Sequence, residues 1–116
     1  WTKGVPVEVV PFAYRSVHQR ISGLHHTKSF SGLSSPAFEL EHPVPVLREA
    51  ARKAGPVVTD NGNFVFDVNL GRINNPAEVE RALKMIPGVV EVGIFSRMAS
   101  EAWFGKQDGT VYSRTP

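Results

Sequence analysis

The sequence has 116 residues, of which 41% are hydrophobic, and this suits one compact domain with a modest core. Its formal net charge of +2 comes from basic and acidic side chains dispersed along the chain, whereas nucleic-acid-binding surfaces concentrate basic residues on one face. There is no cysteine and no run of about 18 apolar residues. Composition therefore excludes a disulfide framework, a thiolate metal site and a membrane span, and it fits a soluble, cytoplasmic protein.

The first predicted elements are a strand and a helix. The chain begins at Trp1 without an initiator methionine and approaches a strand at once, so we expect a fragment or a processed chain. Residues 5–10 are rich in β-branched valine and stop at Pro11, which predicts a strand followed by a break. Proline suits the first turn of a helix, and a helix ending at Gly23 is predicted. Its apolar positions are Ala13, Val17, Ile21 and Leu24.

A long loop and a hairpin are predicted next. Residues 22–43 are rich in serine, glycine and proline and keep no period, so we expect a Ser-rich loop that is either functional or mobile. Val44–Leu47 and Val57–Thr59 each predict a short strand. Because Asn61-Gly62 is a strong turn signal, the second of these strands is expected to form a hairpin with the alternating run Phe64–Leu70.

The second predicted helix has the clearest signals. Asn75 can cap it, Pro76 occupies its first position and Glu78 its third, as in a capping box. An apolar stripe is formed by Val79, Ala82, Leu83 and Ile86. The residues predicted to face water are Glu80, Arg81 and Lys84. Pro87-Gly88 ends the helix.

Two further segments follow the second helix. Val89–Phe95 predicts a strand with Val90, Val92 and Ile94 on one face. The turn signal Gln107-Asp108-Gly109 predicts a final hairpin. Residues 5–95 thus give the order strand, helix, strand, strand, helix, strand, which is typical of an α+β, ferredoxin-like (split βαβ) sandwich. The last twenty residues look like strands that join another sheet.

Two charged residues near the N-terminus are candidates for chemistry. Lys3, just before the first strand, can meet a phosphate or sugar oxygen, although position alone favours a solvated lysine. Glu8 can act as a base if burial raises its pKa. The simpler interpretation, which we favour, is that Glu8 lies on the polar face of a half-buried strand.

Other candidate groups have simpler explanations. Asp60, Asn61, Asn63 and Asp67 lack the spacing of a calcium loop, and turn chemistry accounts for them. No metal site is predicted, because metal-binding spacing is absent among His18, His25, His26 and His42. Trp103 and Phe104 can stack on bases, but few basic residues accompany them, so core packing is preferred. These residues alone leave the function open.

Four runs resemble the C-terminal part of the A-type ribose-5-phosphate isomerases, particularly the eukaryotic ones. They are KGVPVEVVP from Lys3, AGPVVTDNGNF from Ala54, MIPGVV from Met85 and FGKQDG from Phe104. Four matches in the right order over almost the whole chain are hard to produce by chance. The sequence is therefore identified as a member of this family.

The resemblance implies an isomerase that interconverts ribose 5-phosphate and ribulose 5-phosphate through an enediol, in the pentose phosphate pathway, with no cofactor. Such a reaction needs a carboxylate that moves a proton and cationic or acidic groups that stabilise the oxyanion. In similar enzymes the base, the paired aspartates and the phosphate loop lie upstream. No catalytic residue is therefore expected here, and the chain alone is expected to be inactive. Lys3 matches the family's substrate-binding lysine.

The resemblance also implies how the chain is organised. Residues 1–10 would be a strand segment of a larger α/β domain, residues 11–94 a small ferredoxin-like lid domain, and residues 95–116 a terminal hairpin that returns to the larger domain. The implied partners are the sugar phosphate and further copies of the chain, bound through the lid domain. The alternative is a non-catalytic interaction or assembly module that uses the Ser-rich loop and the unpaired edges of its terminal strands.

Overall fold

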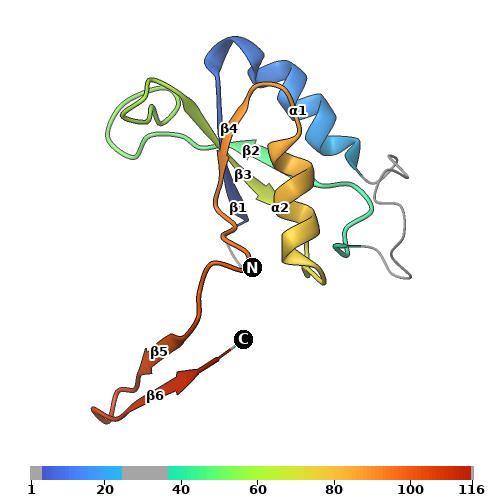
Figure 1. Cartoon of the computed structure of the whole chain (residues 1–116). Coiled ribbons are helices and arrows are strands. Elements are labelled where there is room, and N and C mark those ends of the chain that lie inside the picture. The colour runs from blue at the N-terminus through green and yellow to red at the C-terminus, as the bar shows by residue number, and fades with distance from the viewer. Residues whose placement is uncertain (1–3, 25–36, 116) are drawn as a thin grey trace.

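The computed structural model describes residues 4–24 and 37–115 (Figure 1). Lys3, His25, His26 and most of the predicted Ser-rich loop lie outside these residues. The described part is a small mixed α/β domain with antiparallel sheets. None of its helices is long and apolar enough to cross a membrane.

A four-stranded antiparallel sheet forms the centre of the domain, in the order β2-β3-β1-β4. The strands are β1 (Val5–Val9), β2 (Val44–Leu47), β3 (Phe64–Asn69) and β4 (Val89–Val92). β1 pairs with β3 on one side and with β4 on the other. Val5–Val9, which were expected to belong with residues 1–10 to a larger domain, thus lie inside this sheet.

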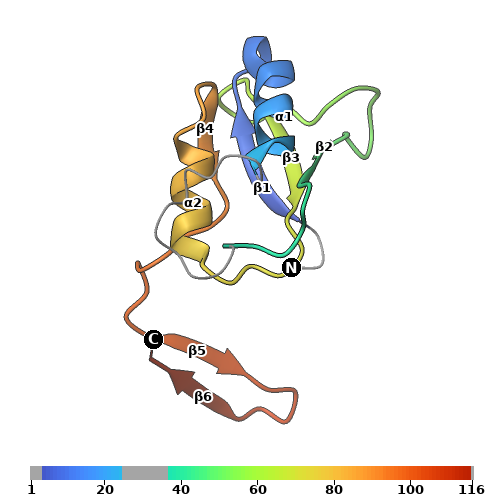
Figure 2. The ribbon, with the colours of Figure 1, turned by 90° about the vertical axis from the view of Figure 1, so that its right-hand side faces the viewer.

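Both helices pack against the same face of the sheet (Figures 1 and 2). The first begins as a short 3-10 turn, η1 (Pro11–Ala13), and continues as α1 (Tyr14–Ser22), and the second is α2 (Pro76–Lys84). The predicted cap is confirmed, since the Asn75 side chain accepts a hydrogen bond from the backbone N–H of Glu78 at 3.2 Å.

The core lies between the helices and the inward face of the sheet. Alternate residues of β1 point into it, and Val7 and Val9 are fully buried. The helices contribute Val17, Ile21, Val79 and Leu83. Burying each such side chain contributes roughly 1.5–3 kcal/mol, so this shared core holds the helices on the sheet.

The predicted strand at Val57–Thr59 is wrong, because only Val58 makes a β-bridge there, to Phe64. The edge of β3 beyond Phe64 is occupied by β2, whose Leu47 lies opposite Phe66. The turn itself forms as predicted: the backbone N–H of Thr59 donates to the carbonyl of Asn63 at 2.9 Å.

The predicted inward face of β4 is wrong for Val90. The pairing with β1 is irregular, since Glu8 lies opposite Glu91 and Val9 lies opposite Val89, which leaves Val90 as an extra residue. Such a bulge reverses the alternation of side chains. Val90 is consequently 46% exposed, whereas Val92 and Ile94 are buried as predicted.

The predicted final hairpin is confirmed as a separate two-stranded sheet, β5 (Ala102–Gly105) and β6 (Val111–Arg114). It extends away from the rest of the domain (Figures 1 and 2). All of its strand residues are exposed, Trp103 at 68%. The expectation that Trp103 and Phe104 pack in a core is therefore wrong for this chain by itself.

Candidate functional site

The main polar cluster on the outer face of the sheet is built around Glu8. Because β1 alternates, Glu8 points away from the helices while its neighbours Val7 and Val9 point into the core. Its Oε1 accepts hydrogen bonds from the Thr59 hydroxyl at 2.7 Å and from the Asn63 side-chain amide at 3.0 Å. A residue near the N-terminus thus holds both ends of a turn more than fifty residues later.

These hydrogen bonds decide what Glu8 can do. The hydrogen bond from Thr59, and then that from Asn63, lower the pKa of the Glu8 carboxyl below its ordinary value of 4.5, and the opposing effect of burial does not outweigh them. The raised pKa that a general base would need is therefore absent, and the placement of Glu8 on the polar face of the strand is confirmed. Glu8 is an anchor for the turn at residues 59–63.

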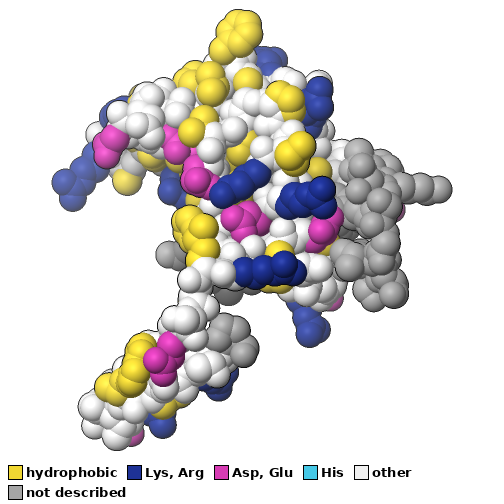
Figure 3. Space-filling model, in the orientation of Figure 1, with side chains coloured by type: hydrophobic (Ala, Val, Ile, Leu, Met, Phe, Trp, Pro, Cys, Tyr) yellow, Lys and Arg dark blue, Asp and Glu magenta, His cyan; other side chains and the backbone are white. Residues whose placement is uncertain are grey.

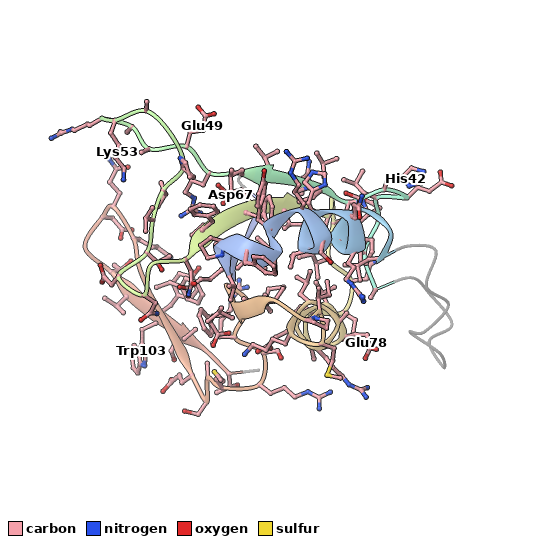
Figure 4. The ribbon with its side chains drawn as sticks, turned by 90° about the horizontal axis from the view of Figure 1, so that it is seen from above. His42, Glu49, Lys53, Asp67, Glu78 and Trp103 are labelled. Atoms are coloured by element: carbon pink, nitrogen blue, oxygen red, sulfur yellow. The ribbon has the colours of Figure 1, made fainter. Side chains whose placement is uncertain are left out.

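A second polar contact fixes the loop that carries this turn. The guanidinium of Arg48 donates to both carboxylate oxygens of Asp67, with Nε 2.9 Å from Oδ2. This fork-to-fork geometry joins the residue after β2 to the outer face of β3. It also lowers the pKa of Asp67, chiefly through the Arg48 hydrogen bonds. Asp67 is labelled in Figure 4, where Glu49 and Lys53 mark the loop that follows β2.

The remaining candidates do not assemble into a site. Asp60 and Asn61 are exposed on the turn, and no group of three or more histidine, aspartate or glutamate side chains in the described part is placed to hold a metal ion. His18 is exposed on α1, where its ring lies edge-on to Phe66 with centroids 5.8 Å apart. His42 is exposed in the segment before β2 (Figure 4). Lys3 lies outside the described residues.

The sequence interpretation missed a buried carboxylate on α2. Glu80, expected to face water, is 9% exposed and is the buried charged residue of the described part. Its Oε2 accepts hydrogen bonds from the backbone N–H of Ser96 at 2.9 Å and from the Ser96 hydroxyl, and its Oε1 lies 3.2 Å from the Lys84 ammonium. The i, i+4 pair with Lys84 was visible in the sequence, but the contact with Ser96 depends on the fold.

Replacing Glu8 by glutamine tests the anchor. Glu8→Gln is expected to lower the free energy of unfolding by about 1 kcal/mol at pH 7, because hydrogen bonds to a charged acceptor are stronger than those to an amide. Since the pKa of Glu8 is lowered in the folded state, its contribution is present above pH 4.5 and is lost as the pH falls through the folded-state pKa.

The difference between wild type and Glu8→Gln in urea denaturation should therefore shrink from pH 6 to pH 3. Glu101→Gln, an exposed glutamate before β5, is the control and should stay within about 0.5 kcal/mol of wild type. A difference for Glu8→Gln that persists at low pH would contradict the role of the carboxylate charge.

Known proteins resemble this chain over nearly its whole length. The family model for ribose 5-phosphate isomerase A (phosphoriboisomerase A) matches residues 2–109. The ribose-5-phosphate isomerase of Homo sapiens is 46% identical over 114 residues, which cover 98% of this chain and 32% of the human protein. That of Schizosaccharomyces pombe is 45% identical over 112 residues, covering 96% of this chain and 35% of the yeast protein. This chain thus spans about a third of the length of these relatives.

Solved structures give the same result. Ribose 5-phosphate isomerase A from Methanocaldococcus jannaschii superimposes with a TM-score of 0.76 at 34% sequence identity, covering 98% of this chain and 42% of that one. A D-ribose-5-phosphate isomerase in complex with phospho-erythronic acid superimposes with a TM-score of 0.77 at 32% identity and the same coverage. The chain belongs to the ribose 5-phosphate isomerase A family.

Proposed function

We propose that the complete polypeptide containing this chain interconverts ribose 5-phosphate and ribulose 5-phosphate through an enediol, and that this chain supplies the part that closes over the sugar phosphate. The observation that carries the proposal is the family match over residues 2–109. A sugar phosphate as substrate is further supported by the names of the relatives and by the relative in complex with phospho-erythronic acid.

The catalytic base of the proposed reaction belongs to the upstream part of the polypeptide. A base that removes a proton from carbon works best with a pKa near the operating pH. In the described residues the carboxyl groups with a shifted pKa are all shifted downwards by hydrogen bonds: Glu8, Asp67, Glu80, Glu91 and Asp108. This supports our expectation that the 116-residue chain alone is inactive.

Within the complete enzyme, we propose that the β1–β4 sheet and its two helices form a ferredoxin-like lid domain. The antiparallel order β4-β1-β3-β2, with both helices on one face, supports this assignment. We propose that the hairpin at residues 95–116 returns to a larger α/β domain, which would cover the exposed Trp103 and Val111. We also propose a cytoplasmic homo-oligomer assembled through the lid domain, whose exposed apolar side chains include Met85 and Val90.

The proposal is tested by an assay of the complete polypeptide with ribose 5-phosphate, following ribulose 5-phosphate formation. Turnover by the complete polypeptide, and none by the 116-residue chain, is the expected result. If the complete polypeptide is folded but shows no turnover, the proposal is wrong. That result would favour the alternative of a non-catalytic interaction module, whose accessible surface would be the hairpin.

Lys3 is the residue of this chain that we propose contacts the substrate. Replacing it by alanine removes a cation that would meet the sugar phosphate, so Lys3→Ala is expected to lower kcat/KM by about 10–100-fold, as for the loss of a charged hydrogen bond. Lys53→Ala, at an exposed loop position (Figure 4), is the matched control and should leave kcat/KM unchanged. Equal values of kcat/KM for the two variants would mean that Lys3 does not contact the substrate.

A further inference from the structure

The segment between β4 and the hairpin is tied to α2 by one carboxylate. After β4 the chain runs through Ser96 and Arg97 before it reaches the hairpin. Ser96 donates both its backbone N–H, at 2.9 Å, and its hydroxyl to Oε2 of Glu80. Both donors of one linker residue therefore converge on a buried side chain of the helix, which fixes the position of that residue against α2.

A cation reinforces this contact from the other side. The ammonium of Lys84 lies 3.2 Å from Oε1 of Glu80 and 2.9 Å from Oε1 of Glu91 in β4. Figure 3 shows basic and acidic side chains interleaved over this side of the domain. Helix, strand and linker are thus joined in one chain of contacts, Ser96–Glu80–Lys84–Glu91. Because Lys84 binds both Glu80 and Glu91, the Glu80 carboxylate is held at the position where it accepts the hydrogen bonds from Ser96.

The linker changes direction directly after this contact. Arg97 has a φ of +58°, and in the described part of the chain it is the non-glycine residue with a positive φ. This left-handed conformation costs roughly 1–2 kcal/mol, so it persists only where the surroundings impose it. Glu80 holds the preceding residue, and beyond Arg97 the chain runs out to a hairpin exposed on both faces. Ser96 and Arg97 thus set the direction in which the linker leaves the sheet domain, and residues 98–101 connect it to β5.

We propose that Glu80 is a positioning residue that sets the angle between the sheet domain and the hairpin, and thereby the fraction of complete enzyme whose lid is aligned over the sugar phosphate. The proposal rests on the function proposed above. If the contact between Glu80 and Ser96 is lost, a smaller fraction of the enzyme has the aligned lid. The apparent affinity for the sugar phosphate then falls in proportion to that fraction. Saturating substrate still selects the aligned state, so kcat is retained.

Kinetics of the complete polypeptide test this role. Glu80→Ala is expected to raise KM about 3–10-fold with kcat within about twofold of wild type. Glu80→Gln keeps an acceptor for Ser96 and should restore at least half of the lost affinity. Glu78→Gln removes a charge from the same helix, two residues before Glu80, and should leave both constants unchanged. If Glu80→Ala lowers kcat with KM unchanged, or changes neither, the positioning role is overturned.

A second measurement does not depend on isomerase activity. The backbone N–H of Ser96 donates to Glu80, so its hydrogen exchange should accelerate at least tenfold in Glu80→Ala and stay near the wild-type rate in Glu78→Gln. Unchanged exchange at Ser96 overturns the anchor itself. Faster exchange in a complete polypeptide without turnover would instead mean that the anchor exists and that the proposed isomerase function has failed.

Discussion

Replacing Phe66 by alanine is expected to lower the free energy of unfolding by about 3–5 kcal/mol, the usual cost of removing a buried aromatic ring. Phe66 lies in the middle of β3 and is 1% exposed. It belongs to the core cluster that joins the sheet to both helices, and the ring of His18 lies against it. A domain of this size is stable by roughly 5–15 kcal/mol, so the variant should be close to unfolding at 37 °C.

Phe12→Ala is the matched control, because it makes the same substitution at a side chain that is 100% exposed. It should change the free energy of unfolding by less than about 0.5 kcal/mol. Urea denaturation at pH 7, followed by far-ultraviolet circular dichroism, measures both variants. Similar losses for the two would mean that the inward face of β3 has been assigned wrongly.

The elements of this fold that local chemistry determines were predictable from the sequence. Asn75 and Pro76 define the start of α2 by themselves, because capping needs only neighbours in the chain. The alternation in Phe64–Asn69 likewise identifies a strand with one buried face, since its period is a property of the extended backbone. Asn61-Gly62 forms a turn in which Gly62 has φ +77°, as that dipeptide favours.

What the sequence could not reveal depends on contacts between distant segments. The bulge that turns Val90 outward exists because β4 must pair with β1, some eighty residues earlier. The burial of Glu80 requires Ser96 to return to α2. Exposure of Trp103 follows from the position of the hairpin outside the core, and its aromatic composition alone favoured the opposite interpretation.

The four runs that resemble the isomerase family were recognisable without any visible chemistry, and the structure gives a physical reason. Glu8 from the first run binds Thr59 and Asn63 from the second. The backbone N–H of Val10 donates to the carbonyl of Gly88, in the third, at 2.9 Å. Three runs far apart in the sequence therefore meet at the C-terminal end of β1, so they support each other's conformation.

At Gly88 the close packing of these segments leaves no room for a side chain. Its φ is +100°, and a Cβ added there would lie 2.5 Å from Cβ of Ala13 and 3.1 Å from Cγ2 of Val17. Gly88→Ala therefore combines backbone strain of roughly 1–2 kcal/mol with overpacking of roughly 1–3 kcal/mol. We expect urea denaturation to show a loss of about 3 kcal/mol in the free energy of unfolding.

Gly55→Ala separates the two causes. Gly55 has a similar φ of +93°, but an added Cβ would meet nothing within 4 Å. Its substitution should cost only the backbone strain, about 1–2 kcal/mol. The difference between the variants, about 1–3 kcal/mol, then measures how closely the turn before β4 packs on η1 and α1. If both variants lose the same amount, Ala13 and Val17 can move aside, and the close packing of this turn is not needed to hold the first helix on the sheet.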